Sequence, residues 1–208
     1  MLRRRPLIWA RLCFCCCYDA SPKLAAGPPT VALHLNGAMA THEERFEPSD
    51  YQKRLLRQTW SDDFDFLYEL GADIYEVIFT SAPDARSLFP SLCQYGDNWR
   101  DSKAFRSQAL KFVQVLATAI QSLPRPESLD PVLRHVGRAH RKYSVRGFKP
   151  KYWDVFQEAI EVAMANHIKN RLDDSLSAQE KMDAVDTWKS LALYLVLRMK
   201  QGYDEESP

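Results

Sequence analysis

Short runs of apolar residues at three- and four-residue intervals, separated by prolines and polar turns, are the feature that most restricts the fold of this chain. The clearest run is Val185, Trp188, Ala192, Leu195 and Met199. This interval places the side chains on one face of an α-helix. Sustained period-2 alternation, the pattern of a half-buried strand, is missing. We therefore predict an all-α fold of six to eight helices.

Five further stretches show the same periodicity. They carry Leu55, Thr59, Trp60, Phe64 and Leu67 after the capping pair Ser49-Asp50; Leu70, Ile74, Val77 and Ile78; Phe105, Ala109, Phe112, Leu116 and Ile120; Val132, Leu133, Val136 and Ala139; and Tyr152, Val155, Phe156, Ala159, Ile160 and Ala163. The second should end before Pro83, because the residue before a proline is disfavoured in a helix. Gly71 within it predicts close approach of another helix. Gly96 to Ser102 is predicted to be a polar loop, and Asp173, Asp174 and Ser177 to separate the last two helices.

Composition narrows the class of protein further. Lysine plus arginine (28) nearly cancels aspartate plus glutamate (27), so no global field favours nucleic acid or a polyacidic partner. Of the five cysteines, Cys93 stands alone in the body, which is not a disulfide framework and indicates a reducing compartment. No stretch reaches the roughly 18 to 20 apolar residues of a membrane span. We expect a cytoplasmic protein.

Residues 1–47 differ from the rest and are predicted to be a disordered extension, followed by a domain at 48–203 and a tail at 204–208. The extension begins with Arg3, Arg4 and Arg5, and an apolar stretch with a cysteine cluster follows: Cys13, Cys15, Cys16 and Cys17. One interpretation is a membrane-surface anchor, acylated on these cysteines, that tethers the protein to the inner face of a membrane. The alternatives are a secretory signal, a tail without a role, or an upstream extension before a start at Met39.

His140 closes the apolar face of the Val132–Ala139 stretch. A histidine there could bind iron through one ring nitrogen while a backbone carbonyl one turn back, that of Val136, holds the other. Alternatively, His140 caps the C-terminus of a helix, where unpaired carbonyls favour a cation. The local sequence leaves both interpretations open.

The order of landmarks across the chain resembles the globin family, and most closely its neuroglobin-like and invertebrate, nematode-type branches. Trp60 lies on the first helix, Pro83 opens a short helix, and Phe89 follows where globins place the phenylalanine that packs on haem. His140, within Gly-Arg-Ala-His-Arg-Lys-Tyr-Ser-Val, matches the proximal iron ligand. Trp188 falls on the last helix, where related globins also carry tryptophan. The resemblance covers roughly residues 50–203 and implies a globin fold around haem b.

The residues that the resemblance places above the iron depart from the commonest globin pattern. The distal position falls on Gln108, where globins most often have histidine, so the sixth iron position is expected to stay open. Tyr75 falls on the second helix, where it would lean over a bound gas. A phenol O–H and an amide N–H aimed at iron-bound O2, each worth about 1 to 3 kcal/mol, would slow its release. We expect high oxygen affinity.

The resemblance also implies a set of cofactor contacts. They are the iron ligand His140 and the pocket residues Phe89, Gln108, Phe112, Tyr75, Val136, Val145 and Lys111. Lys111, Arg138 and Arg141 are candidates for the haem propionates, with ordinary surface charge as the alternative. Without the resemblance, Tyr75 would be read as a core tyrosine and Gln108 as a solvent-facing side chain.

Three functions are compatible with these expectations. The first is reversible binding of O2, and also of NO or CO, for oxygen transport, storage or sensing, without enzymatic activity. The second is a haem redox enzyme, such as an NO dioxygenase, a peroxidase-like protein or an electron-transfer globin, which would need an external reductant. The third is a globin-fold interaction domain without haem.

Overall fold

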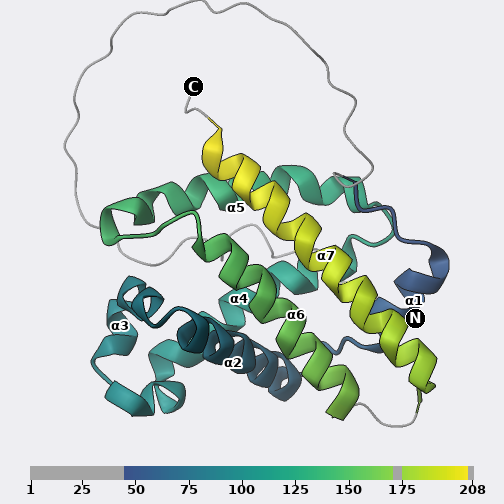
Figure 1. Cartoon of the computed structure of the whole chain (residues 1–208), viewed down its shortest axis with the longest axis horizontal. Coiled ribbons are helices and arrows are strands. Elements are labelled where there is room, and N and C mark those ends of the chain that lie inside the picture. The colour runs from purple at the N-terminus through teal and green to yellow at the C-terminus, as the bar shows by residue number, and fades with distance from the viewer. Residues whose placement is uncertain (1–44, 171–174, 206–208) are drawn as a thin grey trace, which may run out of the picture. The chain divides into compact units, whose positions relative to one another are not determined.

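The computed structural model describes residues 45–170 and 175–205, and every regular element in these two ranges is a helix (Figure 1). The α-helices are α1 Asp50–Gln58, α2 Phe64–Ser81, α3 Pro90–Cys93, α4 Lys103–Gln121, α5 Asp130–His140, α6 Tyr152–Asn170 and α7 Ala178–Asp204. The 3-10 helices between them are η2 Pro83–Leu88, η3 Gly96–Asp101, η4 Pro126–Leu129 and η5 Arg141–Arg146. The prediction of an all-α fold is confirmed.

Side-chain caps and prolines set the ends of these helices. Ser49 and Ser177 each form a capping box at the start of α1 and α7, and each accepts a backbone N–H from the third helical residue. Ser102 caps α4 by accepting the N–H of Phe105 at 3.0 Å. Pro83 begins η2, so α2 ends just before it, as predicted.

The first predicted helix is in fact two helices. The α1 helix ends at Gln58 with Thr59 as its C-cap, and α2 begins only at Phe64. Asp63 caps α2 by accepting the N–H groups of Asp65 and Phe66. The apolar spacing continues across the break between α1 and α2, so the periodicity alone predicted a single helix here. The predicted polar loop at Gly96 to Ser102 is also partly helical, because residues 96–101 form η3. Asp173 and Asp174 lie outside the described residues.

Trp188 lies at the centre of the core. It is 1% exposed, its indole packs on Trp60 with ring centroids 5.9 Å apart, and its Nε1 donates to the Thr59 hydroxyl at 2.8 Å. This bond satisfies a buried donor that would otherwise be costly. The two predicted tryptophan landmarks therefore meet, and they join α7 to the end of α1.

The α2 helix crosses α4 at Gly71. A Cβ atom added to this glycine would lie 2.9 Å from the carbonyl oxygen of Ala109, closer than a side chain tolerates. The close approach predicted from Gly71 is thus present, and it brings the faces of α2 and α4 that carry Tyr75 and Gln108 together.

The long helix α7 packs on α1, α5 and α6, and Figure 1 shows it passing across α5 near its own C-terminal end. Both ends of the predicted domain extend further than expected. Phe46 is buried against Tyr194 with ring centroids 5.7 Å apart. At the other end α7 reaches Asp204, and Glu205 binds arginines of α5.

Within the described residues, no helix combines the length and apolar character that crossing a bilayer requires.

Candidate functional site

Tyr75 is the centre of a buried aromatic cluster between α2 and α4. Its side chain is 3% exposed, and its ring lies 5.4 to 5.6 Å from those of four phenylalanines: Phe79, Phe89, Phe105 and Phe112. Burial raises the pKa of the phenol well above its ordinary value, so the hydroxyl keeps its proton at neutral pH. Tyr75 can therefore donate a hydrogen bond inside an apolar pocket.

Gln108 supplies the second polar group of this cluster. Its Nε2 donates to the Tyr75 hydroxyl oxygen at 2.9 Å, from the neighbouring helix α4. Because the hydroxyl accepts this bond, its own hydrogen remains available for a third partner. Phe112, one turn further along α4, contacts Tyr75 from the same helix. Four of the predicted site residues, Tyr75, Phe89, Gln108 and Phe112, are thus brought together.

His140 ends α5 and lies in a second aromatic group. The rings of Tyr143, Phe148 and Trp153 have centroids 5.5, 5.6 and 5.0 Å from the imidazole. The hydrogen bond expected from Val136 is present: His140 Nδ1 lies 2.8 Å from the Val136 carbonyl oxygen. A carbonyl can only accept, so Nδ1 carries the hydrogen and Nε2 keeps its lone pair.

The protonation state of His140 follows from its surroundings. Burial lowers the pKa of the imidazole below its ordinary value, although the bond to Val136 acts in the opposite direction. The ring is therefore neutral at physiological pH. Among the described residues no hydrogen-bond partner occupies Nε2. A neutral imidazole with one nitrogen held and the other free is the form that binds a transition metal.

A row of rings from α6 connects the two groups. Trp153 contacts His140, Phe156 lies 6.4 Å from Trp153, and Phe112 lies 4.6 Å from Phe156 by ring centroids. The buried Nε1 of Trp153 has no hydrogen-bond partner in the described part of the chain. An unpaired buried N–H is costly. The row of rings is therefore consistent with a surface against which a bound group packs.

These features suit the iron porphyrin that the resemblance implies. His140 would offer a ligand nitrogen, the aromatic row would offer apolar surface for a flat macrocycle, and Tyr75 with Gln108 would offer polar hydrogens. When bound, the group would supply an iron atom that binds diatomic gases. The residues present fit the group.

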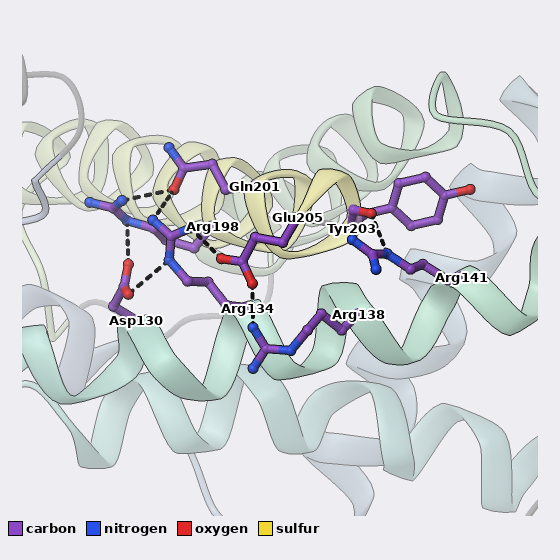
Figure 2. A network of polar contacts seen from close by, with 8 residues as sticks. All are labelled: Asp130, Arg134, Arg138, Arg141, Arg198, Gln201, Tyr203 and Glu205. Carbon is purple, nitrogen blue, oxygen red and sulfur yellow. Dashed lines mark hydrogen bonds and ion pairs between the residues drawn. The ribbon is translucent and has the colours of Figure 1, made fainter. Parts of the chain in front are cut away.

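Of the remaining predicted cofactor contacts, Val136 and Lys111 lie at the edges of the site, and Val145 does not belong to it. Val136 is half-buried on α5, and Lys111 is half-buried on α4, one turn after Gln108. Val145 is 88% exposed in η5 and stands apart from both ring groups. Arg138 and Arg141 bind the end of α7, to the Glu205 carboxylate and the Tyr203 carbonyl oxygen (Figure 2).

Sequence reasoning missed the residues that surround His140. Trp153 and Phe148 were not assigned to the site, although both touch the imidazole. The spacing of Trp153 and Phe156 on one face of α6 is the only local signal that could have found Trp153. Phe148 follows the left-handed turn at Gly147, where periodicity gives no information.

Comparison with known proteins supports the same family. The globin family model matches residues 72–185. Globin-related protein glb-13 of Caenorhabditis elegans is 26% identical over 157 residues, which cover 75% of this chain and 52% of that protein. Cytoglobin-2 of Danio rerio is 27% identical over 121 residues, covering 56% of this chain and 66% of that protein. The chain thus spans about half to two thirds of the length of these relatives.

A solved structure shares the fold. It is a hexacoordinated haem protein from an anhydrobiotic tardigrade, with a TM-score of 0.60 and 21% identity, and the match covers 77% of this chain and 97% of that one. This likeness confirms the predicted globin fold. Since the globin model covers more than half of the sequence, the protein belongs to the globin family.

Proposed function

We propose that this globin binds haem b through His140 and reversibly binds O2 at an open sixth iron position. The observation that carries the proposal is the 2.9 Å bond from Gln108 Nε2 to the Tyr75 hydroxyl inside a buried aromatic cluster. This bond holds the phenol in place with its own hydrogen free to donate. Iron-bound O2 carries partial negative charge, so such a donor stabilises it more than it stabilises the less polar bound CO.

Gln108 also supports the open sixth position. The tardigrade structure is described as hexacoordinated. Here the distal position carries an amide, which is already engaged with Tyr75 and is a much weaker iron ligand than an imidazole. Oxygen, NO and CO are the ligands that we expect at this position. Storage, transport and sensing are all compatible with this chemistry.

An absorption spectrum tests the proposal directly. The full chain, supplied with haemin and then reduced under nitrogen, should show the spectrum of a five-coordinate ferrous haem and convert in air to a stable oxygen complex. His140→Ala should lose the axial histidine bond. Protein that stays colourless with haemin contradicts haem binding. Rapid conversion to ferric iron with turnover of an added reductant would favour the alternative, a haem redox enzyme.

We also propose that the N-terminal segment attaches the protein to a cytoplasmic membrane surface through acylation of Cys13, Cys15, Cys16 or Cys17. These residues lie outside the described part of the chain, and the proposal rests on the adjacent arginines, apolar side chains and clustered thiols in the sequence. In cells fed a clickable palmitate analogue, the wild-type chain should be labelled and a variant with all four cysteines changed to serine should not. Equal labelling of the two would contradict the proposal.

A further inference from the structure

The last two turns of α7 lie directly against the helix that carries His140. A Cβ atom added to Gly137 of α5 would overlap the carbonyl oxygen of Met199, and one added to Gly202 of α7 would overlap the backbone of Arg134. The two backbones therefore touch at both glycines. Gly137 follows Val136, whose carbonyl holds the imidazole.

Ion pairs fasten the same crossing, and Figure 2 shows them between the two helices. The Glu205 carboxylate binds Arg134 at 2.7 Å and also binds Arg138. Arg134 continues to Gln201 at 2.8 Å and to Asp130 at 2.9 Å. Arg198 of α7 pairs with the second oxygen of Asp130 at 2.9 Å. Such a network is more constrained than an isolated surface pair.

A further bond lies immediately beyond the histidine. Arg141 donates through Nε to the Tyr203 carbonyl oxygen at 2.6 Å. Arg138 and Arg141 flank His140 in sequence, and both bind the end of α7. The backbone on either side of the imidazole is therefore tied to one short segment, residues 203–205.

The ring of Tyr203 reaches the surroundings of the imidazole as well. It lies 5.6 Å from the ring of Phe148 and 6.2 Å from that of Trp153 by centroids. Both of these rings contact His140. Tyr203 thus packs on two of the side chains that contact the imidazole.

We propose that Tyr203 and Glu205 are positioning residues for His140, and that through it they set the strength of the iron–histidine bond and the rate of gas release. This inference rests on the proposed function of His140 as the iron ligand. Glu205 fixes the end of α5 along its axis, and Tyr203 fixes the imidazole plane. A small displacement of either would change the geometry that the iron meets.

The test compares two removals with two matched controls in the full chain. Glu205→Gln removes the charge at nearly constant size, and Tyr203→Ala removes the ring. Tyr203→Phe keeps the ring, and Lys189→Ala removes an exposed α7 ion pair with Asp186 far from the crossing. In haem-loaded ferrous protein, the first two should shift the iron–histidine stretching band in resonance Raman spectra and change O2 release by roughly 2- to 30-fold. The two controls should match the wild type.

A second measurement separates this inference from haem binding itself. In haem-free protein labelled with ¹⁵N-histidine, Glu205→Gln and Tyr203→Ala should change the ring nitrogen shifts of His140, whereas the controls should not. Unchanged shifts and an unchanged Raman band, together with lowered melting temperatures, would show a purely structural role and overturn the inference. A wild-type chain that binds no haem would contradict the proposed function, while the nitrogen shifts would still decide the positioning role.

Discussion

Gln108 donates to Tyr75 across the α2–α4 crossing, with 2.9 Å between Nε2 and the hydroxyl oxygen. The bond leaves the phenolic hydrogen unused by Gln108, and burial keeps that hydrogen on the oxygen. The amide of Gln108 is thus hydrogen-bonded to the phenol in the protein itself, without a bound gas. Under the proposed function, the Tyr75 O–H would be the primary donor to the gas, and Gln108 would orient it and offer its other N–H.

Tyr75→Phe should raise the O2 dissociation rate by about 10- to 100-fold, because one hydrogen bond to a partly charged ligand is lost. Gln108→Leu should also raise the rate, and the two effects should not add, since each residue holds the other. Flash photolysis or stopped-flow mixing of the oxygen complex measures the rates. Tyr152→Phe is a suitable control, because that hydroxyl binds Asp84 outside the cluster. Rates equal to wild type in both single variants would refute the hydrogen-bond mechanism.

The stability of the haem-free protein should depend on pH through His140. The folded-state pKa lies below the ordinary value of 6.5, so below that value the unfolded chain binds the proton more readily than the folded one. Stability contributed by the neutral imidazole is therefore complete above about pH 7 and falls as the pH drops from 6.5 toward the folded pKa. Urea midpoints between pH 5.5 and 8 should show this decline.

His140→Gln should flatten that decline, whereas His135→Gln, at an exposed position of the same helix, should retain it. An unchanged slope in His140→Gln would mean that the imidazole titrates alike in the folded and unfolded chains.

Gly137→Ala should destabilise the protein by about 2 kcal/mol or more, because the added methyl group overlaps the Met199 carbonyl oxygen. The sign of the change in unfolding free energy is informative, because replacing glycine by alanine inside an unobstructed helix stabilises a protein by roughly 0.5 to 1 kcal/mol. Chemical denaturation of the two proteins side by side measures the difference. A variant as stable as the wild type would show that α5 and α7 are not in backbone contact.

Thr59→Val should cost about 1 to 3 kcal/mol, because Trp188 Nε1 would lose its only acceptor in the described core. Thr118→Val is a matched control: its hydroxyl donates only to the Gln114 carbonyl of its own helix, at 2.7 Å, in a less buried position. Thermal melting of both variants tests the prediction, which requires a clearly larger loss for Thr59.

Much of the fold could be predicted because its determinants are local. Pro83, Ser49 and Ser177 act on the few residues beside them, and the apolar spacing of α4, α6 and α7 is read directly from the sequence. The break between Thr59 and Phe64 escaped prediction because its cap, Asp63, lies inside an uninterrupted apolar pattern.

The site was predictable only in part. His140 was singled out from its local sequence, and its bond to Val136 followed from helix geometry. Tyr75 and Gln108 were assigned only through the family resemblance. The surroundings of His140 were not found, because Phe148, Trp153 and Tyr203 come from separate segments and meet only in the folded chain. The burial of Phe46 depends in the same way on Tyr194, which lies far along the sequence.

The length of α7 has a consequence for biosynthesis. This helix of 27 residues provides contact surface to α1, α5 and α6 together. A nascent chain leaving the ribosome can form the earlier helices, but it cannot bury Trp60 or complete the surroundings of His140 until α7 has emerged. Haem capture should therefore follow translation of this segment, and ribosome-bound intermediates stalled before residue 178 should remain without pigment.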